Sequence, residues 1–567
     1  MATLRIGQMR DCRIKMPAPS PVSAKHVTRR RWPAIITPLL LRRHPIMIRA
    51  VASVGFLTLV SRITGFVRDT VFAALLGAGP VADAFVVAFR IPNQFRALFA
   101  EGAFQAAFVP SFTALHLGEE RGEASRFARS TLSLLLLASL TVSLLLILFA
   151  EKAIALLAPG MVNDAQRAPL AITYLRYTGI YLVFMSIMAF YASLAQVHGR
   201  YAAAAAAPVL LNVILVLALW LLSPRLGDPG LALAIAVPLS GFVQAGVVAL
   251  SLRRTGEALL PGIIAWSNSL KTFLRRLGPA VLGSGVVQIS AFADTIIVSF
   301  LPAGQISYLY YADRLYQLPF GVIGLALSTV VLPTLSHAFA TKDDAAAVSA
   351  FAKANELALL TSLPVAAMMA IGAQAAVSGL FGYGAFLPSD VTQTAAIVAA
   401  YALGIPASIL MRCLVPTFQA KGDTTTPVRV AAGVLVVSIT LKIVLAERLG
   451  AAGIAAATAI AAWISFVILA IAAHRSKLIA IDRRLYAVLW RTLLGSLIVA
   501  ALMWLVLALP TVQILFAGHS LAKAALLIAI GLFVMLAYSL VLWLSGYRRA
   551  SLLFDRKSAV TASQQKE

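Results

Sequence analysis

Charged side chains interrupt four of the most apolar stretches of the chain, and their residue types suit the binding of an anion. A charge in the hydrocarbon of a membrane costs ~3 kcal/mol or more unless it faces a cavity or a partner. Arginine stays charged at depth, and its planar guanidinium binds phosphate oxygens in pairs. The charged residues of these stretches are Arg62, Arg68, Asp69, Asp83, Arg90, Arg96, Glu101, Asp294, Asp313 and Arg314.

Helical spacing places some of these charges on a common face. Arg62 and Asp69 are seven residues apart and share a face, whereas adjacent residues diverge by about 100°. We therefore do not expect simple pairing between Arg68 and Asp69, or between Asp313 and Arg314. Two interpretations remain: the arginines bind an anionic ligand, or internal ion pairs hold the helices together. We favour the first.

Charges on the remaining apolar stretches are sparser, and they include Arg176, Glu356, Arg412 and Lys442. Arg412 either adds to the positive cluster or neutralises a local acid. Lys442 lies about a turn from the end of its predicted helix, close enough to extend to the surface.

The composition indicates which secondary-structure elements carry these charges. Of 567 residues, 60% are hydrophobic and 12% charged, against about half and a quarter in soluble domains. The apolar residues would fill roughly 14 membrane-spanning helices. This excludes a soluble enzyme, a disordered chain, a one-pass anchor and an outer-membrane barrel. The net charge of +25 fits the cytoplasmic loops of a membrane protein, and we expect no nucleic-acid partner.

We predict an all-α polytopic membrane protein with 14 transmembrane helices, in two pseudo-symmetric lobes plus two C-terminal helices. Loop lysines and arginines gather on the side of the N-terminus, so both termini are expected in the cytoplasm. The predicted helices lie near 50–76, 83–114, 130–150, 169–197, 202–223, 229–252, 278–301, 307–338, 354–381, 391–419, 427–446, 450–474, 487–509 and 521–545.

These helices divide the chain into segments. Residues 1–46 form a basic extension, which is either a cytoplasmic arm or a stretch upstream of a natural start at Met47. We favour the second, because the first span begins just after Met47. The other predicted segments are an N-terminal lobe (47–254), a cytoplasmic amphipathic linker (255–277), a C-terminal lobe (278–476), two helices that suit a lipid-tail groove (477–546) and a cytoplasmic tail (547–567).

A faint internal repeat supports the two lobes. Asp69-Thr70 recurs as Asp294-Thr295, and Ala78-Gly79 recurs as Ala303-Gly304, at the same spacing. The helices near 50–76 and 83–114 therefore look equivalent to those near 278–301 and 307–338. Transporters with such repeats bind their substrate between the lobes.

No motif of the sequence predicts an enzyme, a cofactor or a metal site. The chain has no GxxxxGK[ST] loop, no HExxH pair and no nucleophile elbow. We therefore expect transport that is downhill, ion-coupled or driven by voltage.

Three long motifs resemble the MurJ/MviN family of lipid II flippases. They are "SRITGFVRDTVFAALLGAGPVADAFVVAFRIPNQFRALFAEGAFQAAFVPSF" (61–112), "YYADRLYQLPFGVIGLALSTVVLPTLS" (310–336) and "GDTTTPVRVA" (422–431). The resemblance covers the chain from about Met47 to the C-terminal tail. It implies a multidrug/oligosaccharidyl-lipid/polysaccharide exporter fold that moves lipid II, an undecaprenyl-pyrophosphate-linked peptidoglycan precursor, from the cytoplasmic to the periplasmic leaflet of the bacterial inner membrane.

The resemblance also implies roles for individual residues. Those implied to line a central, substrate-binding cavity are Arg62, Arg68, Asp69, Arg96 and Arg314. Of these, Arg68, Asp69 and Arg314 match the group thought to hold the pyrophosphate, and Asp83 matches a residue linked to the periplasmic gate. Lipid II, membrane lipids and other cell-wall synthesis proteins are the implied partners.

One departure from the family concerns a sodium site that some members have. Asp294 and Thr458 match its ligands, but Ser438 replaces an asparagine and Lys442 replaces an aspartate. We expect the Lys442 ammonium to pair with Asp294 in place of the ion. The alternative is a misalignment by one turn, with Lys442 pointing outward.

The alternative functions are export of another polyprenyl-linked glycan, drug/cation antiport on the same fold, and a non-transporting scaffold for wall synthesis. An antiporter is expected to have an acidic or aromatic cavity, which the arginines argue against. A scaffold is expected to tolerate loss of Arg68 and Arg314.

Overall fold

In the computed structural model, the described residues are 37–99, 102–118, 121–253, 260–341, 343–476, 478, 483–517 and 522–546. The chain divides into two compact units, Met1–Ala52 and Ser53–Glu567. Most of the basic N-terminal extension and the tail at 547–567 lie outside the described residues. The description below concerns the second unit.

The described residues of this unit form helices and connecting segments without strands. The helices of the N-terminal half are α1 (Thr37–Leu76, which begins in the first unit), α2 (Pro80–Phe99), α3 (Ala103–His116), α4 (Arg121–Leu148), α5 (Ala150–Leu157), a 3-10 turn η1 (Pro159–Met161), α6 (Arg167–Thr178), α7 (Tyr181–Val197), α8 (Ala202–Leu221), α9 (Ser223–Leu226) and α10 (Pro229–Ser251).

The C-terminal half continues with the same kind of structure. Its helices are α11 (Asn268–Ser299), α12 (Gln305–Ala340), α13 (Asp344–Ile371), α14 (Ala373–Phe381), α15 (Pro388–Ala402), α16 (Ile405–Ala420), α17 (Thr425–Leu449), α18 (Ala451–Arg475), α19 (Arg483–Ala508), α20 (Pro510–Ala517) and α21 (Ala522–Leu544).

The helical, membrane-spanning class is confirmed, but the count of 14 spans is not. Among the described residues, ten helices are long and apolar enough to cross a membrane. Those ten do not include α1, α2, α11 or α12, the helices that carry nine of the ten charged residues named first above; the tenth, Glu101, lies outside the described residues.

Two helices begin earlier than the hydropathy pattern predicts. α1 begins at Thr37 rather than near residue 50, and α11 begins at Asn268 rather than near 278. The last ten residues of the predicted amphipathic linker are therefore the first ten of α11. The Ser267 hydroxyl accepts a hydrogen bond from the Leu270 backbone N–H and caps this helix. Polar residues can extend a capped helix beyond its apolar part, which is why hydropathy misplaced the boundary.

Turn residues end and restart the helices where the sequence indicates. In the turn before α10, Gly227 has a φ of 69° and Asp228 accepts hydrogen bonds from the Gly230 and Leu231 backbone N–H groups. Pro229 then occupies the first helical position, where no N–H is needed.

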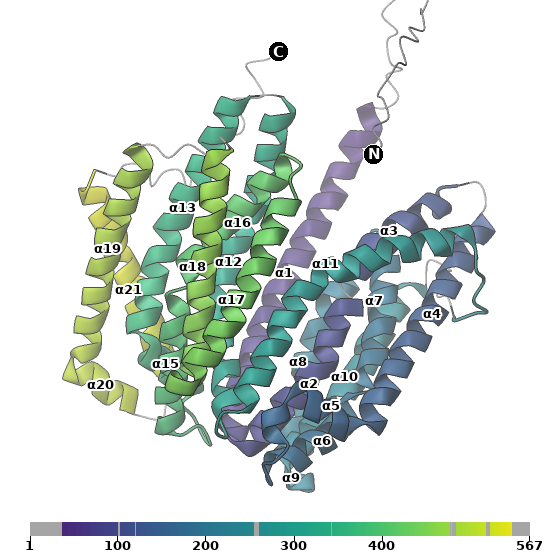
Figure 1. The fold of residues 1–567 in the computed structure, drawn as a ribbon, viewed down its shortest axis with the longest axis horizontal. Helices are drawn as coiled ribbons and strands as arrows, with labels where there is room; N and C mark the ends of the chain where they lie inside the picture. The colour runs from purple at the N-terminus through teal and green to yellow at the C-terminus, as the bar shows by residue number, and fades with distance from the viewer. Residues whose placement is uncertain are drawn as a thin grey trace, which may run out of the picture. The chain divides into compact units, whose positions relative to one another are not determined.

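Packing groups the helices into bundles (Figure 1). One buried cluster joins α3, α4, α7 and the start of α11, and a second joins α12, α13, α16 and α18. A third cluster draws on both halves, with residues of α1, α2, α6, α12, α14 and α15. The C-terminal helices α19 and α21 pack beside α13. The third cluster brings α1 and α12 together, and the candidate site lies between these two helices.

Candidate functional site

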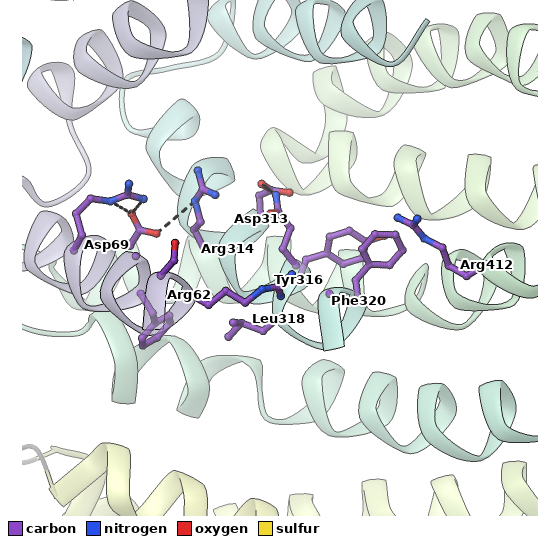
Figure 2. A pocket seen from close by; sticks show the side chains of 14 residues that line it. Arg62, Asp69, Asp313, Arg314, Tyr316, Leu318, Phe320 and Arg412 are labelled. Carbon is purple, nitrogen blue, oxygen red and sulfur yellow. Dashed lines mark hydrogen bonds and ion pairs between the residues drawn. The ribbon is translucent and has the colours of Figure 1, made fainter. Parts of the chain in front are cut away.

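A cavity of about 680 Å³ lies between α1, α12 and α16. Its walls carry four arginines and two aspartates, which leave two positive charges in excess. They are Arg62, Arg68, Asp69, Asp313, Arg314 and Arg412 (Figure 2). An apolar-walled cavity with uncompensated guanidinium groups suits an anionic ligand.

Asp69 is the centre of a network that joins α1 to α12. Arg68 donates from Nε and Nη2 to Asp69 Oδ1, at 3.0 and 2.6 Å. The Tyr310 hydroxyl of α12 donates to the same oxygen at 2.9 Å. On the other side, Arg314 Nε lies 3.5 Å from Asp69 Oδ2. One carboxylate therefore holds two arginines from different helices.

The expectation that Arg68 and Asp69 do not pair is wrong. Their Cα–Cβ bonds do diverge, but the long Arg68 side chain folds back to reach the carboxylate beside it. Asn212 of α8 stabilises this bend, since its Oδ1 accepts from Arg68 Nη1 at 2.9 Å. Asn212 fits against α1 because residue 65 is glycine, whose missing side chain leaves the amide room.

Arg314 is the network arginine most available to a ligand. Its side chain is 33% exposed, against 9% for Arg68. Its guanidinium lies over the Tyr310 ring, 4.6 Å from the centroid, which orients it without neutralising it. Its buried Nε lacks a hydrogen-bond partner.

Two glycines of α12 make room for arginines from both sides of the cavity. A Cβ at Gly321 would collide with the guanidinium of Arg62, and one at Gly324 would touch the stem of Arg412. Arg412 lies over the Phe320 ring, 4.6 Å from its centroid. Figure 2 shows Arg62 and Arg412 on opposite sides of Tyr316 and Phe320. Arg412 thus lines the cavity, as expected if it adds to the positive cluster.

Asp83 lies outside this cavity and joins the start of α2 to the start of α12. The carboxylate is fully buried. It accepts hydrogen bonds from the Gly304 N–H at 2.7 Å, the Ser307 N–H at 2.9 Å and the Ser307 hydroxyl at 2.5 Å. Gly304 has a φ of 92°, and Asp83 caps the helix that follows it. Arg167 of α6 lies 3.8 Å from the same carboxylate.

A second contact lies at the same end of the helices. The Ala385 N–H donates to Ala74 O at 2.8 Å, and Gly77 and Gly384, both with positive φ, leave no room for a Cβ. The α1–α2 turn thus packs directly on the α14–α15 segment.

Asp294 and Lys442 form an ion pair between α11 and α17. Lys442 Nζ lies 2.5 Å from Asp294 Oδ1, and the Lys442 side chain is only 2% exposed. The alternative, an outward-pointing Lys442, is therefore wrong for this structure.

Of the other predicted site residues, Arg96 lies in the last turn of α2, and its side chain is outside the described part. Sequence reasoning missed Tyr310, Asn212, Arg167 and Ser307. Only Tyr310 carried a usable signal, since it lies four residues before Arg314 and so shares its helix face.

The fold is shared with solved membrane transporters. An inward-facing multidrug resistance MATE transporter of the MOP superfamily matches with a TM-score of 0.58 at 16% identity, over 75% of this chain and 95% of that one. The fold and the charged cavity define a multi-pass helical membrane protein of this architecture.

More specific matches lie within one family. The family described as "Lipid II flippase MurJ" matches residues 72–525. The "Probable lipid II flippase MurJ" of Rhizobium meliloti (strain 1021) is 37% identical to this chain, over 75% of this chain and 80% of the relative. The protein of the same description from Vibrio cholerae is 35% identical, over 80% of this chain and 87% of the relative. A structure described as "Lipid II flippase MurJ, inward closed conformation" gives a TM-score of 0.73 at 25% identity, over 87% of this chain and 99% of that one. The chain belongs to the MurJ family of lipid II flippases.

Proposed function

We propose that this protein moves lipid II from the cytoplasmic to the periplasmic leaflet of the bacterial inner membrane. The observation that carries the proposal is the cavity with two excess positive charges, in a chain that belongs to the MurJ family. The pyrophosphate of lipid II is an anion that arginine forks bind well. Drug/cation antiport on the same fold is not favoured, because cationic drugs would be repelled by such a cavity.

In this mechanism Arg314 and Arg68 hold the pyrophosphate, and Arg62 and Arg96 add positive charge along the path. Asp69 keeps the first two arginines close together before the substrate arrives. The pyrophosphate then competes with Asp69 for Arg314, the more exposed of the two. The polyprenyl tail stays in the lipid, beside the C-terminal helices.

Transport proceeds by alternating access, and Asp83 serves as the gate on the periplasmic side. Both termini lie in the cytoplasm in this orientation, which places the end of α1 and the start of α2 on the outside. The contacts of Asp83 with Gly304 and Ser307 then hold the outer end closed. The membrane potential suits the return step, since moving one charge across 100 mV is worth ~2.3 kcal/mol.

We expect Asp83→Ala to open the outer end more often. Hydrogen bonds to a charged group contribute about 1.5–3 kcal/mol each. Losing them should raise the ratio of open to closed outer ends at least tenfold. The measurement is the labelling rate of Gln317→Cys, in the cavity, by an impermeant thiol reagent added outside cells, with Cys12 and Cys413 replaced. Glu151→Ala, an exposed acid on α5, is the control. Equal labelling rates in both variants would contradict the gate.

The function is tested by depleting the protein from its own cells. An external enzyme that cleaves only exposed headgroups then measures lipid II on the outer leaflet. We expect exposed lipid II to fall, the inner pool to rise, and the wild-type chain to restore both. Unchanged exposure after depletion would mean that the cargo is another lipid-linked glycan or that this chain does not transport.

A further inference from the structure

A second cavity, of about 850 Å³, lies between α14, the start of α15 and the C-terminal helices. We call it the α14–α21 cavity. One wall includes Gln374, Ser378 and Tyr383, and the other includes Leu507, Phe516 and Lys523. It shares no lining residue with the arginine cavity. The segment after α14 also contacts the α1–α2 turn, so the cavity lies at the end of the bundle near Asp83.

Lys523, in the first turn of α21, is the charged group of this cavity. Its residue is 4% exposed, and its ammonium lies over the Tyr383 ring, 5.9 Å from the centroid. Among the described residues, no carboxylate lines the cavity and none forms an ion pair with Lys523. A buried charge without a counter-charge is destabilising, which indicates that an anion from outside the chain completes the site.

The acid in the first turn of α15, Asp390, does not line the cavity and has hydrogen-bond partners of its own. Asp390 accepts a hydrogen bond from the Tyr308 hydroxyl at 2.7 Å and one from the Leu387 N–H at 2.8 Å. Its Oδ1 thus holds the start of α15 against α12, and its Oδ2 caps the first turn of α15 itself. Lys523 is left facing the cavity.

The rest of the lining indicates what kind of anion fits. Gln374, Ser378 and Gln513 offer hydroxyl and amide hydrogen-bond donors, and Leu507 and Phe516 offer an apolar wall. The helices that frame the cavity, α19 and α21, expose large apolar side chains, as helices in contact with lipid do. Examples are Trp504, Leu505, Leu532 and Phe533. The surrounding lipid is therefore the nearest source of an anion for this cavity.

We propose that the α14–α21 cavity binds the phosphate headgroup of an anionic membrane lipid, with Lys523 as its counter-ion and the start of the acyl chains against Leu507 and Phe516. In the orientation proposed above, this lipid belongs to the outer leaflet. The site is separate from the arginine cavity and requires only that the chain spans a membrane, so its test is independent of lipid II transport.

The test is the thermal unfolding of the purified full chain in a neutral detergent, with three probes: phosphatidylglycerol, phosphatidylcholine and inorganic phosphate. We expect phosphatidylglycerol to raise the Tm of the wild type, and the other two to have little effect. Lys523→Met should weaken the apparent affinity for phosphatidylglycerol about tenfold or more, and Lys523→Arg should retain most of it. Lys152→Met is the matched control, because Lys152 also lies over a ring, 5.5 Å from the Phe149 centroid, but is exposed.

A second variant separates the cavity from the charge. Ala375→Phe fills the cavity and keeps Lys523, so it should also lose the response to phosphatidylglycerol. Without lipid, Lys523→Met should unfold at or above the Tm of the wild type, because it removes an unpaired buried charge; strong destabilisation would reveal an internal partner and overturn the proposal. An equal phosphatidylglycerol response in wild type and Lys523→Met would also overturn it. A full response to inorganic phosphate would assign the site to a free anion instead of a lipid.

Discussion

Cells that depend on Arg68→Ala, Arg314→Ala double-variant protein are expected to expose at least a hundredfold less lipid II on their outer leaflet than wild-type cells. Each arginine offers the pyrophosphate charge-assisted hydrogen bonds of about 1.5–3 kcal/mol. The loss of both also leaves the Asp69 carboxylate facing an anionic substrate, with the Tyr310 hydroxyl as its one remaining partner among the described residues. A combined loss of ~3–6 kcal/mol corresponds to a factor of about 10²–10⁴.

The single variants should differ in a defined way. Arg314 is the more exposed arginine, so Arg314→Ala should impair transport mainly through substrate binding. Arg68→Ala should also loosen the network, because Arg68 links Asp69 to Asn212. Lysine variants keep the charge but lose the planar fork, and should retain only part of the activity.

The readout for these variants is exposed lipid II after depletion of the wild-type chain, normalised to the amount of each variant in the membrane. Arg176→Ala, which removes an exposed arginine of α6, is the control and should leave exposure unchanged. A double variant that exposes as much lipid II as the wild type would reject the arginine site and favour a scaffold.

Lys442→Met is expected to lower the free energy of unfolding by about 3–5 kcal/mol, because it leaves Asp294 as a largely buried charge without its partner. Asp294→Asn combined with Lys442→Met should recover most of this loss, since no unpaired charge remains. The measurement is thermal or denaturant unfolding of the purified protein in detergent, with Lys152→Met as an exposed control.

Alanine variants of the same two residues test whether the ammonium occupies the place of a cation. We expect the wild type to be equally stable in sodium and potassium salts, because Lys442 already neutralises Asp294. The hypothesis fails if sodium stabilises the purified wild type, and if this effect persists in Lys442→Ala and vanishes in Asp294→Ala.

The class of fold and the identity of most charged site residues could be predicted without the structure. Long apolar segments, and charges within them, are local properties that can be counted along the chain. Hydropathy detects only the apolar part of a helix, and this explains why α11 begins at Asn268 rather than near residue 278. Its first turns are polar and are stabilised by the Ser267 cap.

Interactions between distant residues could not be predicted in this way. Arg68 reaches the adjacent Asp69 only because Asn212 and Tyr310, from two other helices, support its bent side chain. The sequence shows that residue 523 is a lysine, but it does not show that this lysine is buried beside the α14–α21 cavity.

The sequence by itself determined a polytopic helical membrane protein with arginines and aspartates at fixed depths, because hydropathy and helical period depend only on neighbouring residues. The tertiary structure decided which charges meet. Asp83 caps α12 across 221 residues of chain, and Lys442 meets Asp294 across 148. Such partners depend on how whole helices pack against one another. Hydropathy does not distinguish between the possible arrangements, whereas the free-energy cost of an unpaired buried charge does.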